Sequence, residues 1–412
     1  MVNSLHKILH LDRKDRVKSL NFFTFLMIVA TLCAMGASAL SNTDLRIASY
    51  VSELLLIGYS FGNSHRIKGS GIDINAVVFV GVVVVLNNLL SPHQPQYSDL
   101  IKIAGYFCCF YYGTTLARRY NRLYVNKVLL YSLIFVPVLV VAIFDHSVLK
   151  NVFFTTSNTF VYTGLSMGLF YALINYKERN FMMIAWMIVA FYVLICTSLG
   201  VVVAILLAYM ILNVKMTHLP YLLSAGVVVI LAVLFIDIPL FVRIRDVINV
   251  WLSMSASDWN NLQDINYYEL NNRVNITGER GDVASSIWRL AHWSNIFTEY
   301  VKHVWTIPFG MGAGFSLTHT GLMPHNDFLM ILSEYGLIVF CLFVKFITRI
   351  YKRMKGERML VYFILAMFIY HLTENLMLTF PPNALFYFVL GWCMIKFKEK
   401  QKVLNNESST DK

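Results

Sequence analysis

Long apolar stretches alternate with short polar connections over most of the chain. We count twelve stretches close to the length that crosses about 30 Å of hydrocarbon. They are residues 20–40, 46–62, 71–91, 97–117, 126–145, 159–176, 181–197, 200–214, 219–241, 327–348, 359–379 and 381–397. The pattern predicts an all-α integral membrane protein with about twelve transmembrane helices. The seventh and eighth stretches are short and nearly continuous, so their boundary is the least distinct.

One long polar segment, about residues 242–325, interrupts this pattern. We therefore divide the chain into helices one to nine (1–241), a large loop (242–325), helices ten to twelve (326–397) and a tail (398–412). Residues 284–305 of the loop carry apolar side chains at three- and four-residue steps, which predicts an amphipathic helix. The expected apolar face comprises Ile287, Leu290, Trp293, Phe297, Tyr300 and Val304.

The polar face of this helix comprises Ser285, Arg289, His292, Glu299 and His303. A helix lying on a membrane surface would aim Arg289 and His292, one turn apart, at the same ligand. A solvated polar face is the alternative, and we favour it for Glu299 and His303.

Composition supports a membrane protein, because 57% of the residues are hydrophobic and only 14% are charged. The net charge of +11 does not require a nucleic-acid partner, since the positive-inside rule accounts for it. With twelve spans and an internal N-terminus, 25 of the 34 Lys and Arg residues fall on the cytoplasmic side. The other nine are Arg46, Lys102, Lys150, Arg243, Arg245, Arg273, Arg280, Arg289 and Lys302. Both termini are thus expected inside and the loop outside.

The six cysteines all lie in apolar stretches, which excludes a large external domain held by disulfides. No Cys/His spacing resembles a zinc site, and the loop has no Asp-x-Asp motif of the kind that nucleotide-sugar enzymes use for a metal. We therefore expect neither a metal nor a cofactor.

Two ionisable residues, Glu53 and Lys102, lie within or at the edge of apolar stretches. An ionisable group there is a functional candidate by default. Lys102 is close enough to the external surface to snorkel, so we interpret it as an interfacial anchor. No inverted repeat or matched pair of broken helices indicates a transporter.

His325 stands where the loop ends and the tenth apolar stretch begins. Asn326 and Asp327 follow it, and both suit the start of a helix. One interpretation is a helix cap with a bystander imidazole. The other is a general base, because an imidazole titrates near neutral pH and can take a proton from an attacking hydroxyl.

A glycine-rich segment, Pro308-Phe309-Gly310-Met311-Gly312-Ala313-Gly314-Phe315, precedes His325. Glycines at this spacing can present backbone N–H groups to an anion. A flexible turn is equally compatible with the sequence. No strand precedes the segment and no Gly-Lys-Ser/Thr follows it, so neither a P-loop nor a dinucleotide fold is supported.

The order of several motifs resembles the O-antigen ligase/O-antigen polymerase superfamily. These motifs are Trp288-Arg289-Leu290-Ala291-His292-Trp293, Pro308-Phe309-Gly310-Met311-Gly312, His325-Asn326 with Gly336 ten residues later, and His371-Leu372-Thr373-Glu374-Asn375 before a Pro-Pro pair. The resemblance implies a GT-C-like, metal-independent glycosyltransferase of lipopolysaccharide biosynthesis in the bacterial inner membrane. Its donor would be an undecaprenyl-pyrophosphate-linked glycan on the periplasmic face.

The resemblance also implies roles for particular residues. His325 would activate the acceptor hydroxyl, and loop arginines would hold the pyrophosphate, a task that suits the guanidinium fork. Arg289 is the first candidate. The other expected substrate-binding residues are Arg243, Arg245, Arg273, Arg280, His292 and Asn326. For Arg243 and Arg245, anchoring at the membrane interface is an interpretation of equal weight.

Two positions depart from the pattern of many relatives. Leu199 stands where a Ser-Arg-Gly motif would have arginine, and Val339 stands where ligases tend to have Gly, Thr or Tyr. These differences favour a polymerase of repeat units, with an O-antigen ligase as the alternative and a lipid-linked oligosaccharide flippase as a third. The expected partners are the lipid-linked donor, a glycan acceptor, membrane lipid and a chain-length regulator protein, without nucleic acid.

Overall fold

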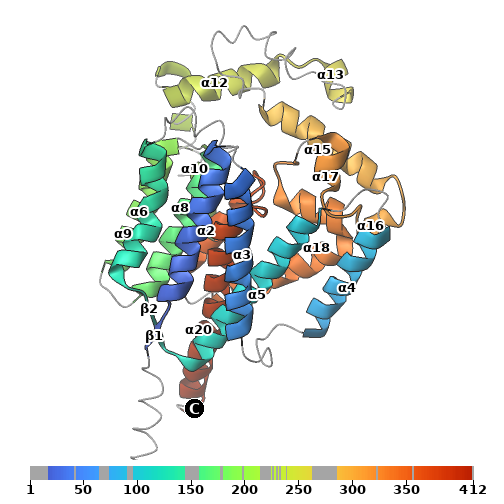
Figure 1. The fold of residues 1–412 in the computed structure, drawn as a ribbon. Helices are drawn as coiled ribbons and strands as arrows, with labels where there is room; N and C mark the ends of the chain where they lie inside the picture. The colour runs from blue at the N-terminus through green and yellow to red at the C-terminus, as the bar shows by residue number, and fades with distance from the viewer. Residues whose placement is uncertain are drawn as a thin grey trace, which may run out of the picture. The chain divides into compact units, whose positions relative to one another are not determined.

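The computed structural model describes residues 17–40, 43–64, 74–90, 96–143, 157–176, 180–196, 199–213, 224, 227–228, 231, 233–237, 239–261, 285–321, 323–354 and 357–410. It is 84% helical, which confirms the all-α class (Figure 1). The only strands in these ranges are β1 (Val17–Ser19) and β2 (Arg122–Tyr124), which pair in parallel with Val17 opposite Arg122.

Helices occupy eleven of the twelve predicted apolar stretches. They are α2 (Asn21–Leu40), α3 (Thr43–Asn63), α4 (Ile74–Leu90), α5 (Tyr97–Arg119), α6 (Lys127–Ile143), α8 (Ser157–Ile174), α9 (Phe181–Cys196), α10 (Leu199–Asn213), α18 (Asp327–Met354), α19 (Arg358–Tyr370) and α20 (Phe380–Thr410). The remaining stretch, 219–241, is described only in part, with about half of its residues outside the described ranges. Between the predicted ninth and tenth stretches the structure has five helices in its described ranges, the first of which begins three residues before the predicted loop. They are α12 (Pro239–Leu252), α13 (Ala256–Asn260), α15 (Ser285–Val301), α16 (Thr306–Phe309) and α17 (Phe315–Thr320).

Only one of the described helices, α18, is both long and apolar enough to cross a membrane by itself. Seven further apolar helices in the described ranges have 10–17 residues. A bilayer-spanning helix needs about 20 apolar residues. The predicted twelve spans are therefore not confirmed by these helix lengths and stay a prediction.

The chain divides into two compact units, each described by itself. The first comprises Met1–Val85, Gln96–Ala208 and Cys341–Lys412, and the second comprises Leu86–Pro95 and Tyr209–Phe340. The second unit therefore joins the predicted loop to the end of α4 and to the first half of α18.

In the first unit, α20 packs against both α5 and α8. Glycines make the contact between α5 and α20 unusually close. A Cβ atom on Gly113 would overlap the carbonyl oxygen of Phe388, and one on Gly391 would overlap that of Phe110. Helices whose contact positions lack side chains can approach until their backbones touch, as small residues allow in membrane helix pairs.

The helix α19 ends at Tyr370, nine residues before the predicted stretch does. A buried hydrogen-bond network holds the turn that follows. The hydroxyl of Tyr162 donates to Asn383 Oδ1 at 2.6 Å and accepts from His371 Nε2 at 2.9 Å. The Asn383 amide donates to the carbonyl oxygens of Leu376 and Thr379 at 2.6 and 2.9 Å. These hydrogen bonds give the carbonyl oxygens of Leu376 and Thr379 partners in a segment that is not helical.

The predicted amphipathic helix is confirmed as α15, but it ends at Val301 rather than near residue 305. The Thr306 hydroxyl donates to the carbonyl oxygens of Tyr300 and His303 at 2.5 and 2.6 Å, which closes the helix end. The predicted apolar residues differ in burial, and contact of this face with a membrane stays a prediction. Phe297 and Val304 are 48% and 85% exposed, whereas the buried side follows Ile287, Ala291, Ile296 and Tyr300. Val304 lies in the turn after the helix, so helical spacing does not orient it.

Candidate functional site

His325 has a left-handed backbone, with φ 49°, and is the only non-glycine residue with a positive φ in the part of the chain that the structure describes. This conformation costs an L-residue about 1–2 kcal/mol. Hydrogen bonds hold the residues on either side of His325 in place. The Trp293 indole N–H donates to the carbonyl oxygen of Pro324, and Asn326 Oδ1 accepts from the Leu329 N–H at 3.0 Å. The predicted capping role of Asn326 is thereby confirmed, and the imidazole is partly buried.

The indole ring of Trp288 links two of the predicted site residues. It stacks on the His292 ring with centroids 5.1 Å apart and meets the His325 ring edge-on at 5.6 Å. Arg289 is the next residue of α15 and is partly buried. The structure thus brings His292 and His325 to one aromatic ring. Neither Trp288 nor Trp293 has a predicted site role, although both belong to the motif that carries the resemblance.

The structure does not test substrate binding by the other four predicted arginines. Arg245 pairs with the carboxylate of Asp237 and donates to the carbonyl oxygen of Leu234 at 3.1 Å. Arg243 lies in α12, but its side chain is outside the description. Arg273 and Arg280 lie outside the described residues. A role for any of these four in binding pyrophosphate stays a prediction.

The glycine-rich segment does form a cluster of N–H donors, but the anion that they bind is a side chain of the protein itself. The Glu334 carboxylate accepts hydrogen bonds from the N–H groups of Gly314 and Ser316 at 3.0 and 3.3 Å. The backbone carbonyl oxygen of Glu334 accepts one from the Gly312 N–H at 3.0 Å. Glu334 is buried in α18. The segment is thus a turn held by Glu334, and the N–H groups of Gly312, Gly314 and Ser316 are already bonded within the chain.

Two asparagines near the end of α4 complete the same cluster. Asn88 Oδ1 accepts from the Ala313 N–H at 2.8 Å, and the Asn87 amide donates to the Glu334 carbonyl oxygen at 3.1 Å. Both side chains are buried. A polar pair inside an apolar stretch was the available sequence signal for this contact.

The helix α18 contains a break at Gly336, where φ is 83° and ψ is 170°. This conformation is essentially restricted to glycine. Gly336 is the glycine that the resemblance placed ten residues after Asn326. The break separates a short helix that follows His325 from the longer apolar part of α18.

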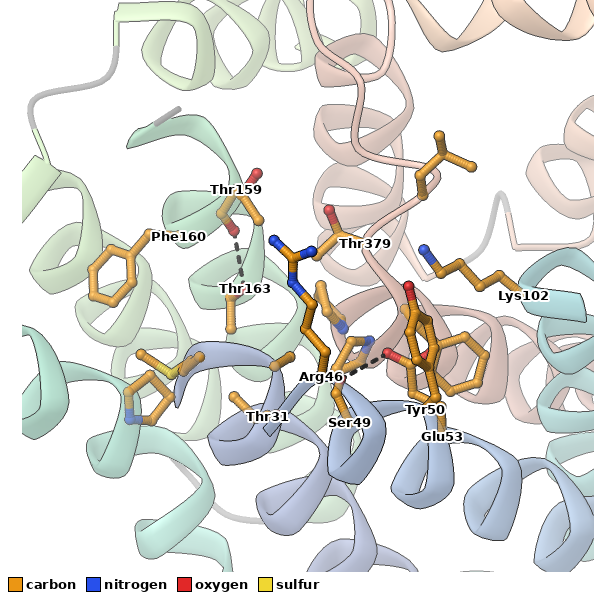
Figure 2. A pocket seen from close by; sticks show the side chains of 17 residues that line it. Thr31, Arg46, Ser49, Tyr50, Glu53, Lys102, Thr159, Phe160, Thr163 and Thr379 are labelled. Carbon is orange, nitrogen blue, oxygen red and sulfur yellow. Dashed lines mark hydrogen bonds between the residues drawn. The ribbon is translucent and has the colours of Figure 1, made fainter. Parts of the chain in front are cut away.

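The first unit contains a cavity of about 330 Å³ (Figure 2). Glu53 and Lys102, which the sequence marked as ionisable groups in apolar stretches, both line it, together with Arg46. The predicted interfacial position of Lys102 is not tested by this arrangement. In the described ranges, no three His, Cys, Asp or Glu side chains are grouped as metal ligands would be.

No protein-family model and no curated protein sequence matches the chain. The resemblance to the O-antigen ligase/O-antigen polymerase superfamily therefore rests on the order and placement of the motifs.

Proposed function

We propose that the protein polymerises lipid-linked oligosaccharide repeat units, of O-antigen or a related surface polysaccharide, at the periplasmic face of the bacterial inner membrane. It would be a metal-independent glycosyltransferase with a GT-C-like fold and about twelve spans. Its donor is a glycan on undecaprenyl pyrophosphate, and its acceptor is a sugar hydroxyl.

The conformation of His325 is the observation that carries this proposal. Glycine or asparagine would adopt a left-handed backbone at lower cost, so a histidine here is not explained by the turn. Strained residues that their surroundings hold in place tend to lie at functional sites. The hydrogen bonds of Trp293 and Asn326 hold both sides of His325. This supports a role for the imidazole beyond that of a bystander.

The proposed reaction follows from these groups. The His325 imidazole takes the proton of the acceptor hydroxyl as its oxygen bonds to the anomeric carbon of the donor. The bond between that carbon and the pyrophosphate oxygen breaks, and undecaprenyl pyrophosphate leaves with the electron pair. The Arg289 guanidinium offsets the charge of this leaving group. Trp288 keeps the His325 ring in place by edge-to-face contact.

The membrane location is supported by apolar helices in eleven predicted stretches and by the distribution of Lys and Arg. A cysteine introduced at the exposed Ser257 of α13 tests it. We expect Ser257→Cys to react with an impermeant thiol reagent in intact spheroplasts, more than the parent protein does. Labelling only after lysis would contradict a periplasmic loop.

Deleting the gene and separating the surface polysaccharide on a gel tests the activity. A single repeat unit on lipid A-core supports the polymerase. Bare core with accumulated lipid-linked polymer supports the alternative, an O-antigen ligase, which shares the donor and the proposed chemistry. Bare core with lipid-linked repeat units retained on the cytoplasmic side indicates the flippase. An unchanged polysaccharide profile contradicts all three.

A further inference from the structure

The cavity in the first unit lies at the beginnings of four helices. Arg46 is in the first turn of α3, Lys102 is near the start of α5, Thr159 is in the first turn of α8, and Thr379 directly precedes α20. Each helix carries partial positive charge at its N-terminal end. Arg46, Thr159 and Thr379 lie within one turn of the ends of α3, α8 and α20, and these three ends favour a negatively charged occupant.

Arg46 is the side chain best placed to bind that occupant. In Figure 2 its guanidinium extends between Thr159 and Thr163 on one side and Thr379 on the other. Within the described part of the chain, we find no hydrogen bond or ion pair made by this guanidinium. A cation in the first turn of a helix is unfavourable for the helix dipole, so helix stability does not explain Arg46.

The other charges of the cavity largely offset one another. Lys102 is close enough to interact electrostatically with both Glu53 and Asp99, of which Glu53 lines the cavity. Glu53 also accepts a hydrogen bond from the Ser49 hydroxyl at 3.4 Å. The residues that line the cavity thus include two cations, Arg46 and Lys102, against the one carboxylate of Glu53, because Asp99 does not line it.

The lining of the cavity combines polar and apolar side chains. Threonine hydroxyls accompany Arg46, while Met35, Pro137, Phe160 and Phe380 contribute apolar surface. A free inorganic anion would leave this apolar surface in contact with water. A lipid headgroup, which joins a charged group to an alkyl chain, would cover it.

We propose that this cavity binds the phosphoryl group of a membrane lipid, with the Arg46 guanidinium as its main ligand. The guanidinium fork matches two phosphoryl oxygens, and the threonine hydroxyls can donate to the others. None of the residues assigned to glycosyl transfer lines the cavity. A polymerase joins two lipid-linked glycans, so the lipid phosphate of the acceptor is the ligand that such a second site would take. This last identification rests on the proposed function.

Native mass spectrometry of the purified full-length protein in detergent tests the site. The probes are undecaprenyl phosphate, undecaprenol with the same tail and no phosphate, and inorganic phosphate. All variants carry Arg289→Ala, which removes the cation proposed for the donor. We expect undecaprenyl phosphate to bind more tightly than undecaprenol, and Arg46→Ala to weaken its binding about tenfold or more. Arg46→Lys keeps the charge without the fork and should give an intermediate loss.

Arg119→Ala is the matched control, because it removes an exposed cation from the opposite end of α5. It should leave binding unchanged. Equal binding of undecaprenyl phosphate to the parent and to folded Arg46→Ala would overturn the proposal. Binding of inorganic phosphate as tight as that of the lipid would overturn the assignment to a lipid. A failed polymer assay with Arg46-dependent lipid binding would contradict only the proposed function.

Discussion

The backbones of Gly310 and Gly336 cross in direct contact. A Cβ atom on Gly310 would lie 2.6 Å from the Gly336 nitrogen, and one on Gly336 would lie 2.5 Å from the Gly310 nitrogen. Both residues have a positive φ, of 85° and 83°. This crossing fixes the glycine-rich segment against α18 only eleven residues after His325, so the geometry of the candidate site depends on it.

Gly336→Ala should prevent normal folding of the second unit. The added Cβ atom meets backbone atoms that cannot move aside, and the conformation itself costs a non-glycine residue about 1–3 kcal/mol. We expect a large loss of folded protein in size-exclusion chromatography after extraction in detergent, and the same result for Gly310→Ala.

Two other glycines provide graded controls. Gly321 has a φ of 73°, but a Cβ atom added there would meet no other atom. Gly321→Ala should therefore show the backbone strain alone, with a moderate loss of folded protein. Gly58 lies in α3 with open space around it, and Gly58→Ala should be neutral. Equal yields for Gly336→Ala and Gly58→Ala would show that the crossing is not required.

Glu334→Ala should destabilise the glycine-rich segment without altering any proposed reacting group. The N–H groups of Gly314 and Ser316 would be left buried without their acceptor, at about 1–3 kcal/mol each. Glu334→Gln keeps one carbonyl oxygen and should cost less. Thermal unfolding followed by tryptophan fluorescence measures both variants.

The matched control is Glu299→Ala, which removes a carboxylate whose partner Lys302 is largely exposed. Surface pairs of this kind contribute about 0–1 kcal/mol. A Glu334→Ala melting temperature as close to the parent as that of Glu299→Ala would contradict the role of Glu334.

The sequence predicted elements well where local signals determine them. Tyr97 begins both the fourth apolar stretch and α5, and Asp327 begins α18 directly after the predicted cap at Asn326. It failed where partners are distant. The turn after α19 contains His371, whose hydrogen-bond partner Tyr162 lies 209 residues away in the sequence. The role of Glu334 was not predicted, because it depends on N–H donors in the glycine-rich segment, which lies elsewhere in the sequence. Hydrophobic periodicity does not identify such partners.

His325→Gly should separate catalysis from folding. Glycine accepts the left-handed backbone without strain, so the variant should fold at least as well as the parent. Loss of a general base typically lowers the rate about 10²–10⁴-fold. We expect little or no polysaccharide polymer at normal protein abundance, measured on a gel beside an immunoblot. Normal polymer from His325→Gly would end the catalytic interpretation.

Asn326 serves as the comparison for His325. Asn326→Ala removes the acceptor of the Leu329 N–H and should cost about 1 kcal/mol in stability while leaving the imidazole able to accept a proton. Its polymer should fall only as far as its protein level does. Asn326→Ser restores a cap and should recover both quantities. A specific activity as low as that of His325→Gly would mean that Asn326 acts on the substrate.

Arg289→Lys should lose most activity although it keeps the positive charge. A lysine ammonium does not reproduce the planar fork that binds two phosphate oxygens together. Polymer per unit of protein measures the effect, and Arg119→Lys is the comparison, because Arg119 is an exposed cation without a proposed role in glycosyl transfer. Turnover by Arg289→Lys near the parent value would leave Arg289 without a role in binding pyrophosphate.

The hydrogen bonds from α4 to the glycine-rich segment also constrain the order of events during biosynthesis. Asn88 and Asn87 bind residues 225 and 247 positions later in the chain. At about 5–20 residues per second, a ribosome needs roughly 10–50 s to make those partners after α4 emerges. Throughout that interval the two amides lack the bonds that they make in the finished protein. Substitutions in α4 should therefore affect how much of the newly made chain escapes proteolysis, even though α4 carries none of the residues assigned to glycosyl transfer.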